Sequence, residues 1–356
     1  MIESVGYAAK SKRSKLKRHE FEREEPGPED VQIDILYCGV CHSDLHQVRN
    51  EWHNTIYPCL PGHEIVGRVS RVGAKVTKFR VGDTVGVGCM IDSCGECEGC
   101  RKGLEQYCEG PHGATMTYNG PMEPDGTNTF GGYSSNIVVR EKFVLRIPPS
   151  IPPERAAPIL CAGVTTYSPL SKWRVKAGHE VAVVGIGGLG HMAIKLAKAM
   201  GARVTAITTS KEKKGDLQRL GADETFLSTD KKAMAAHEMA FDFVLSTIPD
   251  PYDVNPYVKL LKRDGSLVSV GVLAPYEKSL DNSEVAFHRR SVAGSLIGGI
   301  PETQEVLDFC AQHGIAADVE LIPIQDINDA FDRMQQGEVR FRYVIDMKTI
   351  AEDEEE

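Results

Sequence analysis

Two patterns of hydrophobic and polar positions divide the chain. Up to about residue 150, Gly and Pro repeatedly break short apolar segments, and strands are expected at 31–37, 65–72, 84–87 and 135–139. From about residue 176, short apolar strands alternate with segments of helical periodicity, which is the pattern of a parallel sheet with crossover helices. The pattern therefore predicts an irregular β-rich domain followed by a doubly wound α/β domain.

The α/β part begins with a predicted strand at 180–184 and a helix directly after it. Gly201 is expected to end this helix, whose apolar residues share one face: Leu189, Met192, Ala193, Leu196 and Met200. Further strands are expected at 203–208, 241–246, 266–271 and 291–296. Two helices, 301–313 and 327–336, and a strand at 342–347 complete the chain. Periodicity does not decide whether this tail extends the parallel sheet or returns to the first domain.

Composition narrows the class of protein. The chain has 356 residues, of which 41% are hydrophobic, enough for about two globular domains. It shows no apolar run of membrane-spanning length and no secretion signal at the N-terminus, so a cytoplasmic protein is expected. A net charge of −9 argues against a nucleic-acid partner. One local exception, the basic run at 10–18, is interpreted as a solvated hairpin, and the acidic run at 352–356 as a solvating tail.

A glycine-rich turn marks the start of the first crossover helix. Its sequence, G-x-G-x-x-G, is formed by Gly185, Gly187, Gly188, Leu189 and Gly190, and it follows an apolar strand directly. Glycines in that context let the backbone approach a pyrophosphate, and the helix N-terminus offers free N–H groups. A glycine-rich turn without a ligand is the alternative, but the surrounding strand and helix favour a dinucleotide.

The end of the second strand indicates which dinucleotide. NAD enzymes place an acidic residue there to bind the ribose 2′-OH. Here the residues are Thr208, Thr209 and Ser210, and Lys213 and Lys214 follow closely. Hydroxyl and ammonium groups favour a 2′-phosphate, so NADP(H) is predicted. Alternatively, the lysines only solvate the next helix.

Four cysteines lie close together in a loop rich in Gly and charged residues. Cys94, Cys97, Cys100 and Cys108 have the spacing C-x2-C-x2-C-x7-C, which suits a closed, structural zinc site. An iron–sulfur cluster also uses four cysteines, but the Cys-Pro ending typical of such clusters is missing. Acidic neighbours oppose a nucleic-acid-binding zinc ribbon.

A second set of metal-binding residue types is spread over three segments. Cys41, the pair His63-Glu64 and Cys161 provide two thiols, one imidazole and a carboxylate. A Cys2His site leaves one position of tetrahedral zinc open for substrate or water, which is the arrangement of a catalytic site. Taken alone, Cys161 would be an ordinary buried core cysteine.

Five motifs together resemble the zinc-dependent medium-chain alcohol dehydrogenases, in the branch of the cinnamyl alcohol dehydrogenases. They are Gly39 to His46, Gly62-His63-Glu64, the four-cysteine loop, Cys161-Ala162-Gly163 and the turn at 185–190, and they run in order over nearly the whole chain. The resemblance implies a GroES-like catalytic domain at 1–155, a Rossmann domain at 156–297 and a return segment at 298–356 that completes the catalytic domain. It also implies two zinc ions per chain, one catalytic and one structural.

Residue roles follow from the same resemblance. Cys41, His63 and Cys161 would hold the catalytic zinc, Glu64 would approach the metal during ligand exchange, and Asp44 would orient His63. Zinc would polarise an aldehyde for hydride transfer from NADPH. Ser43 would then relay a proton through the cofactor ribose to His46 and solvent. The family often has Thr at position 43, and Ser keeps the hydroxyl.

Substrate and assembly are implied less specifically. Gln47 and Trp52 match positions that line the substrate pocket in the family, which suggests an apolar cleft for aromatic and aliphatic aldehydes with broad specificity. The family suggests a homodimer or homotetramer. Two alternatives stay open: an NAD-linked polyol dehydrogenase of the same superfamily, and a non-catalytic protein that binds zinc and nucleotide.

Overall fold

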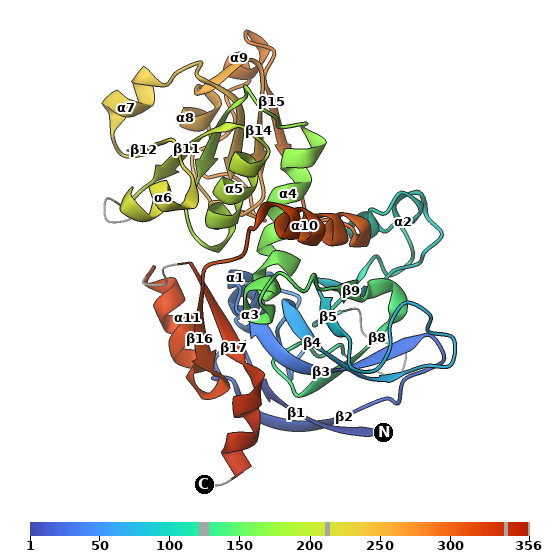
Figure 1. Ribbon diagram of the computed structural model, residues 1–356. Coiled ribbons are helices and arrows are strands. Elements are labelled where there is room, and N and C mark those ends of the chain that lie inside the picture. Colours follow the sequence, from blue (N-terminus) through green and yellow to red (C-terminus); the bar gives the residue numbers. More distant parts are fainter. Residues whose placement is uncertain (121–127, 211–213, 338–340, 355–356) are drawn as a thin grey trace. The chain divides into compact units, whose positions relative to one another are not determined.

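The computed structural model describes residues 1–120, 128–210, 214–337 and 341–354 (Figure 1). The chain forms two compact units: unit 1 comprises 1–161 and 298–356, and unit 2 comprises 162–297. Residues 156–161, which the prediction assigned to the Rossmann domain, therefore lie in unit 1. None of the helices in the described residues combines the length and apolar character that crossing a bilayer requires.

Unit 1 is built on a seven-stranded sheet. Its main path runs β16 (Val319–Pro323), β17 (Arg342–Asp346), β3 (Asp30–Gly39), β4 (Ile65–Val72), β5 (Thr84–Val87) and β9 (Leu145–Arg146), and β8 (Asn136–Arg140) pairs with β3. Two small sheets accompany it, β1 (Ile2–Ala8) with β2 (Lys17–Arg23) and β6 (Met90–Asp92) with β7 (Thr115–Met116). The first pair confirms the hairpin expected around the basic run. The helices of unit 1 are α1 (His42–Val48), α2 (Glu98–Arg101), α3 (Pro153–Ala156), α10 (Ile300–His313) and α11 (Ile327–Gln335).

The C-terminal segment joins the sheet of unit 1. β17 pairs antiparallel with β3, with Val344 opposite Gly39, and β16 lies parallel to β17 at the sheet edge. Gly314, with a φ of 64°, ends α10 in the left-handed conformation that glycine adopts without steric cost. The strand pairing decides what periodicity left open, since the tail returns to the N-terminal part of the chain.

Unit 2 contains a six-stranded parallel sheet. The order is β12 (Glu224–Leu227), β11 (Arg203–Thr208), β10 (Glu180–Val184), β13 (Phe241–Ser246), β14 (Leu261–Ser269) and β15 (Ser291–Gly294). Numbered within the unit this is 3-2-1-4-5-6, the Rossmann order, and it confirms the predicted doubly wound sheet. β14 begins at Leu261 rather than at 266, and β15 ends at Gly294 rather than at 296.

The central strands of this sheet are apolar on both faces. Val181, Val183 and Val244 are fully buried, as expected when crossover helices cover both sides. α4 (Ala162–Lys172) precedes the first strand of the sheet. The connections between strands carry α5 (Gly188–Ala199), α6 (Lys214–Leu220), α7 (Lys231–Ala236), α8 (Asn255–Val258) and α9 (Asn282–Ala286).

Candidate metal centre and cofactor site

Four residues with metal-binding side chains meet inside unit 1. The ligand atoms of Cys41, His63, Glu64 and Cys161 all lie within 4.8 Å of one another, and all four residues are buried. Cys41 is the N-cap of α1, and His63 and Glu64 directly precede β4. The antiparallel pairing of β3 with β4 brings these segments together, since the Gly39 N–H donates to the Glu64 carbonyl at 2.9 Å.

Asp44 organises the imidazole of this cluster. Its Oδ1 lies 2.9 Å from His63 Nδ1 and accepts from the Gly62 N–H at 3.2 Å, while its Oδ2 accepts from the Cys41 N–H at 2.9 Å. With Nδ1 held by the carboxylate, the other ring nitrogen is left for a metal. His63 Nε2 indeed lies 3.3 Å from Cys161 Sγ.

Two buried tyrosines surround Asp44 and His63. The Tyr133 hydroxyl donates to Asp44 Oδ2 at 3.0 Å. The Tyr118 ring lies 5.6 Å from the His63 ring, centroid to centroid. Burial, with the Asp44 charge, raises the pKa of both phenols well above the ordinary value, so both remain protonated. Sequence reasoning missed both tyrosines because nothing nearby in sequence marks them.

The Glu64 carboxylate of the cluster is paired with a buried cation, Arg342. Arg342 Nη2 lies 3.3 Å from Glu64 Oε1, and both side chains are nearly inaccessible to solvent. Burial raises the pKa of Glu64 to about 7, against the opposing effect of the Arg342 charge. Neither carboxylate oxygen accepts a hydrogen bond from the described residues. Two buried oxygens without hydrogen-bond donors fit a carboxylate placed beside a cation.

The thiols of the cluster interact with each other. A hydrogen bond with Cys161 is the main reason that the pKa of Cys41 lies well below its ordinary value, and the same bond raises the pKa of Cys161. The buried Cys89 also hydrogen-bonds with Cys161, which lowers the pKa of Cys89. That buried thiol thus belongs to the surroundings of the cluster.

The predicted relay and pocket residues lie on or near α1. Ser43 and His46 are half-buried, and His46 Nδ1 pairs with the Glu51 carboxylate. The Trp52 ring lies 5.7 Å from the His46 ring, centroid to centroid. Gln47 is buried and donates its amide hydrogens to Asn54 Oδ1 at 2.8 Å and Thr55 Oγ1 at 2.7 Å.

The four cysteines of the loop also gather, with sulfur atoms within 4.8 Å of one another. Backbone N–H groups point at the sulfurs: Cys97 Sγ accepts from Cys100 at 3.4 Å and from Glu109 at 3.3 Å. These hydrogen bonds lower the pKa of Cys97 to about 6. A thiolate so stabilised is the form that binds zinc. The arrangement of four sulfurs is consistent with the predicted closed site.

The glycine-rich turn of unit 2 has the geometry that its sequence predicts. Gly185 has a φ of 83°, and Gly187 is the N-cap of α5. A Cβ on Gly190 would lie 2.2 Å from the Gly185 carbonyl oxygen, whereas a Cβ on Gly187 would meet nothing within 4 Å. Gly190 therefore allows α5 to pack against the turn, and Gly187 leaves its N-terminus open to a phosphate.

The residues predicted to select the dinucleotide follow β11. Thr208 is buried, and its Oγ1 accepts from the Ser210 N–H at 3.2 Å, while Thr209 is exposed. Lys214 begins α6, and Lys213 lies outside the described residues. No carboxylate stands at 208–210.

Comparison with known proteins gives matches over both units. The model of the alcohol dehydrogenase GroES-like domain matches residues 27–149, and that of the zinc-binding dehydrogenases matches residues 188–312. The chain is 54% identical to aldehyde reductase YahK of Escherichia coli, over 99% of each chain. It is 49% identical to NADP-dependent alcohol dehydrogenase C 1 of Mycolicibacterium smegmatis, over 97% of this chain and 98% of the relative. A solved cinnamyl alcohol dehydrogenase of Helicobacter pylori, complexed with NADP(H), superposes with a TM-score of 0.90 at 43% identity, covering 98% of this chain and 99% of that one.

Proposed function

We propose that this chain, which belongs to the zinc-dependent medium-chain alcohol dehydrogenases, reduces aldehydes to primary alcohols reversibly with NADPH as hydride donor. Membership of the family confirms the resemblance drawn from the sequence, and with it the GroES-like domain, the Rossmann domain and the assignment as an oxidoreductase. The observation that carries the proposal is the buried cluster of Cys41, His63 and Cys161. With two thiols and one imidazole, three strong ligands leave one metal position for a substrate oxygen.

The donor set fits zinc. Cys41, His63 and Cys161 would hold the ion, and the buried Glu64 carboxylate, whose oxygens accept no hydrogen bond from the described residues, would face it. Zinc there supplies a Lewis acid that polarises the carbonyl bond of the aldehyde. Asp44 fixes the tautomer and orientation of His63, so the imidazole presents Nε2 without reorganisation. Arg342 balances part of the negative charge of Glu64 and the thiolates.

Reduction needs a hydride on the carbonyl carbon and a proton on the oxygen. When NADPH is bound, its nicotinamide would supply the hydride with its electron pair, which would leave NADP⁺. We assign the proton to the Ser43 hydroxyl, replenished through the cofactor ribose from His46. The Glu51 carboxylate, paired with His46 Nδ1, orients that ring. In alcohol oxidation each proton moves in the reverse direction.

NADPH is the proposed dinucleotide because of the residues after β11. Thr208, Thr209 and Ser210 offer hydroxyl and N–H groups and no carboxylate that would repel a 2′-phosphate. The names of the relatives, one NADP-dependent and one complexed with NADP(H), support the same choice. The N-terminus of α5, left open by Gly187, would bind the pyrophosphate.

Broad specificity for aromatic and aliphatic aldehydes is proposed for the substrate side. Trp52, beside His46, would provide an apolar surface, and Gln47, whose amide hydrogens go to Asn54 and Thr55, would line the same cleft. An assembly of two or four chains in the cytoplasm completes the proposal. Light scattering of the purified protein tests the assembly, and a monomer would contradict it.

The direct test is the initial rate of benzaldehyde reduction with NADPH and with NADH. We expect kcat/KM to be at least ~10-fold higher with NADPH, because one charge-assisted hydrogen bond to the 2′-phosphate contributes about that factor in affinity. Thr209→Asp should reverse this preference by repelling the phosphate, and Thr209→Ala should change it little. NADH preferred by the unaltered protein would favour the NAD-linked polyol dehydrogenase. No turnover of any aldehyde, with zinc and nucleotide bound, would favour the non-catalytic protein.

A further inference from the structure

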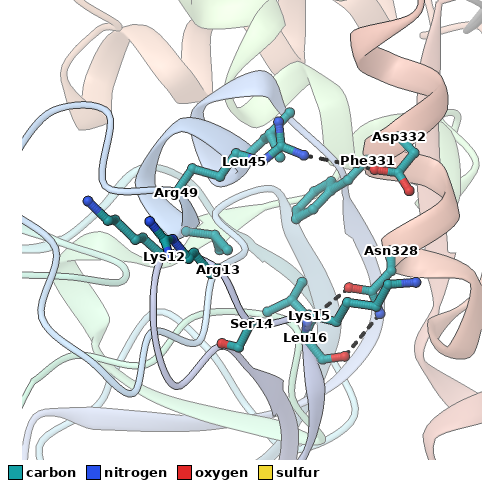
Figure 2. Close-up of a pocket in the computed structure, with 11 residues that line it drawn as sticks. Lys12, Arg13, Ser14, Lys15, Leu16, Leu45, Arg49, Asn328, Phe331 and Asp332 are labelled. Atoms are coloured by element: carbon teal, nitrogen blue, oxygen red, sulfur yellow. Dashed lines mark hydrogen bonds and ion pairs between the residues drawn. The ribbon is translucent and has the colours of Figure 1, made fainter.

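A hollow of about 120 Å³ opens on the surface of unit 1 (Figure 2). It lies between α1, α11 and the N-terminal loop, which is the segment 9–16 that joins β1 to β2. None of the proposed metal ligands or relay residues lines it. The residues that do are Lys12, Arg13, Ser14, Lys15, Leu16, Leu45, Val48, Arg49, Asn328, Phe331 and Asp332. It is therefore separate in its residues from the metal cluster and from the glycine-rich turn.

The charge of this hollow is opposite to that of the whole chain. Four cations line it, Lys12, Arg13, Lys15 and Arg49, against the single carboxylate of Asp332. Arg49 Nη2 lies 3.8 Å from Asp332 Oδ1, and Figure 2 shows that pair at one side of the hollow. Within the described part of the chain, no ion pair joins the three cations of the loop to a carboxylate. In a chain with a net charge of −9, this local excess favours an anionic ligand.

The floor of the hollow is apolar. Leu16, Leu45, Val48 and Phe331 are each at most 5% exposed, so only a small part of each side chain is left for a ligand. Leu45, Val48 and Arg49 have the i, i+3 and i+4 spacing that places side chains on one face of α1. Cations at the rim and carbon atoms below them suit a ligand with an anionic head and an apolar stem.

The walls are held in place by hydrogen bonds. Ser14 Oγ accepts from the N–H groups of Lys10 and Ser11 at 2.8 and 2.9 Å, which closes the loop on itself. The Asn328 side chain of α11 accepts from the Leu16 N–H at 2.9 Å and donates to its carbonyl at 3.0 Å. The loop is thus fixed to α11 before a ligand binds, so the entropy cost of ordering it on binding is small.

We propose that this hollow binds a small organic anion, a phosphate monoester or carboxylate on a short apolar stem. Size sets the length of the stem, because a cavity of about 150 Å³ accommodates a benzene molecule. A volume of about 120 Å³ therefore accepts a charged head and only a few carbon atoms. The head replaces Asp332 as the partner of Arg49 and also pairs with the loop cations, while the stem covers Leu45 and Phe331.

The test is calorimetric titration of the zinc-loaded protein with propyl phosphate at low salt. Saturating NADP⁺ is present, so that the phosphate sites of the dinucleotide are filled. A dissociation constant on the order of 1 mM is expected, with inorganic phosphate several-fold weaker. The variant Lys12→Gln/Arg13→Gln should weaken propyl phosphate at least ~10-fold. The matched control Lys75→Gln/Lys78→Gln, which removes two exposed cations elsewhere in unit 1, should change it less than ~2-fold.

Asp332→Asn is a second test variant, and it should bind propyl phosphate more tightly, which a misfolded protein would not do. Removing the competing carboxylate frees Arg49, so this variant should bind propyl phosphate about threefold more tightly than the parent. Equal weakening in the test and control variants would overturn the proposal, because the binding would then be general charge attraction. Absence of binding to the parent, or equal binding of inorganic and propyl phosphate, would overturn it as well. Benzaldehyde reduction by the same samples shows separately whether the enzyme is intact.

Discussion

Arg342 Nη2 lies 3.3 Å from Glu64 Oε1, and the two side chains are among the most deeply buried charges of the chain. Arg342 also donates from Nη1 to the Val40 carbonyl at 3.1 Å, one residue before Cys41. A strand from the C-terminal segment thus places a fixed positive charge beside a carboxylate and two thiols. The return of the chain to unit 1 is therefore part of how the metal cluster is built.

Replacing Arg342 tests how strongly this charge is coupled to Glu64. Arg342→Met leaves the Glu64 carboxylate buried without its cation, and we expect a loss of about 3 kcal/mol in the free energy of unfolding at pH 8. Urea denaturation of the zinc-loaded protein measures it. The double variant with Glu64→Gln should be less destabilised than the sum of the single variants. Strict additivity would mean that the two side chains do not interact.

Asp44 is predicted to act on the metal through His63. Asp44→Asn removes the charge that orients the imidazole, and zinc affinity should fall by roughly 10- to 100-fold. Competition with a chelator measures that affinity, and kcat for benzaldehyde should fall with it. Tyr133→Phe is the matched variant, since it removes only one of the hydrogen bonds to Asp44 and should have a smaller effect in the same direction. An unchanged zinc affinity in Asp44→Asn would contradict the assignment.

The cysteine loop is predicted to hold the second zinc ion independently of the first. Cys97→Ser should lower the metal content of the purified protein from about two ions per chain to about one, because a four-thiolate site loses affinity with any ligand. Elemental analysis gives the stoichiometry. Cys310→Ser, at a buried thiol outside both clusters, is the control and should keep both ions. Retention of two ions by Cys97→Ser would show that the loop does not bind zinc through this thiolate.

Asp242 gives unit 2 a pH-dependent contribution to stability. Burial opposes its ionisation, but hydrogen bonds from Lys262 Nζ and the Glu180 N–H, both at 2.8 Å, outweigh burial and lower its pKa. A carboxyl with a lowered folded-state pKa stabilises above its unfolded pKa, and this contribution is lost as pH falls through the folded value.

Asp242→Asn should therefore cost about 1 kcal/mol near pH 7, after allowance for solvent screening, and progressively less below about pH 4. Urea unfolding at several pH values gives the difference between variant and parent, and Asp250→Asn at an exposed position serves as reference. A difference that grows toward low pH would have the wrong sign.

The sequence predicted the elements and ligands that local patterns mark. Alternating apolar segments located β3, β4 and β10, and close spacing marked the four cysteines as one site. The start of β14 was expected five residues too late, because Arg263 and Asp264 interrupt its apolar run at the point where its pairing with β13 is irregular.

Residues whose importance comes from tertiary packing were missed. Arg342 lies 302 positions from Val40, and Tyr133 lies 89 positions from Asp44, so no spacing rule connects them. Cys89 and Cys38 both lie at the end of an apolar strand, so their sequence positions do not distinguish them. Only the packing shows that Cys89 interacts with Cys161. The role of Cys161 itself came from family resemblance, since a single buried cysteine carries no local signal.

Metal dependence of benzaldehyde reduction by NADPH tests the central claim most directly. The rate is measured on the protein as purified, after removal of metal and after return of zinc, in the parent and in Cys41→Ser. We expect at least a ~100-fold loss on removal, recovery with about two zinc ions per chain, and no recovery in Cys41→Ser. Turnover that persists without metal, or that zinc restores equally in Cys41→Ser, would contradict the account of Cys41, His63 and Cys161 as a catalytic zinc site.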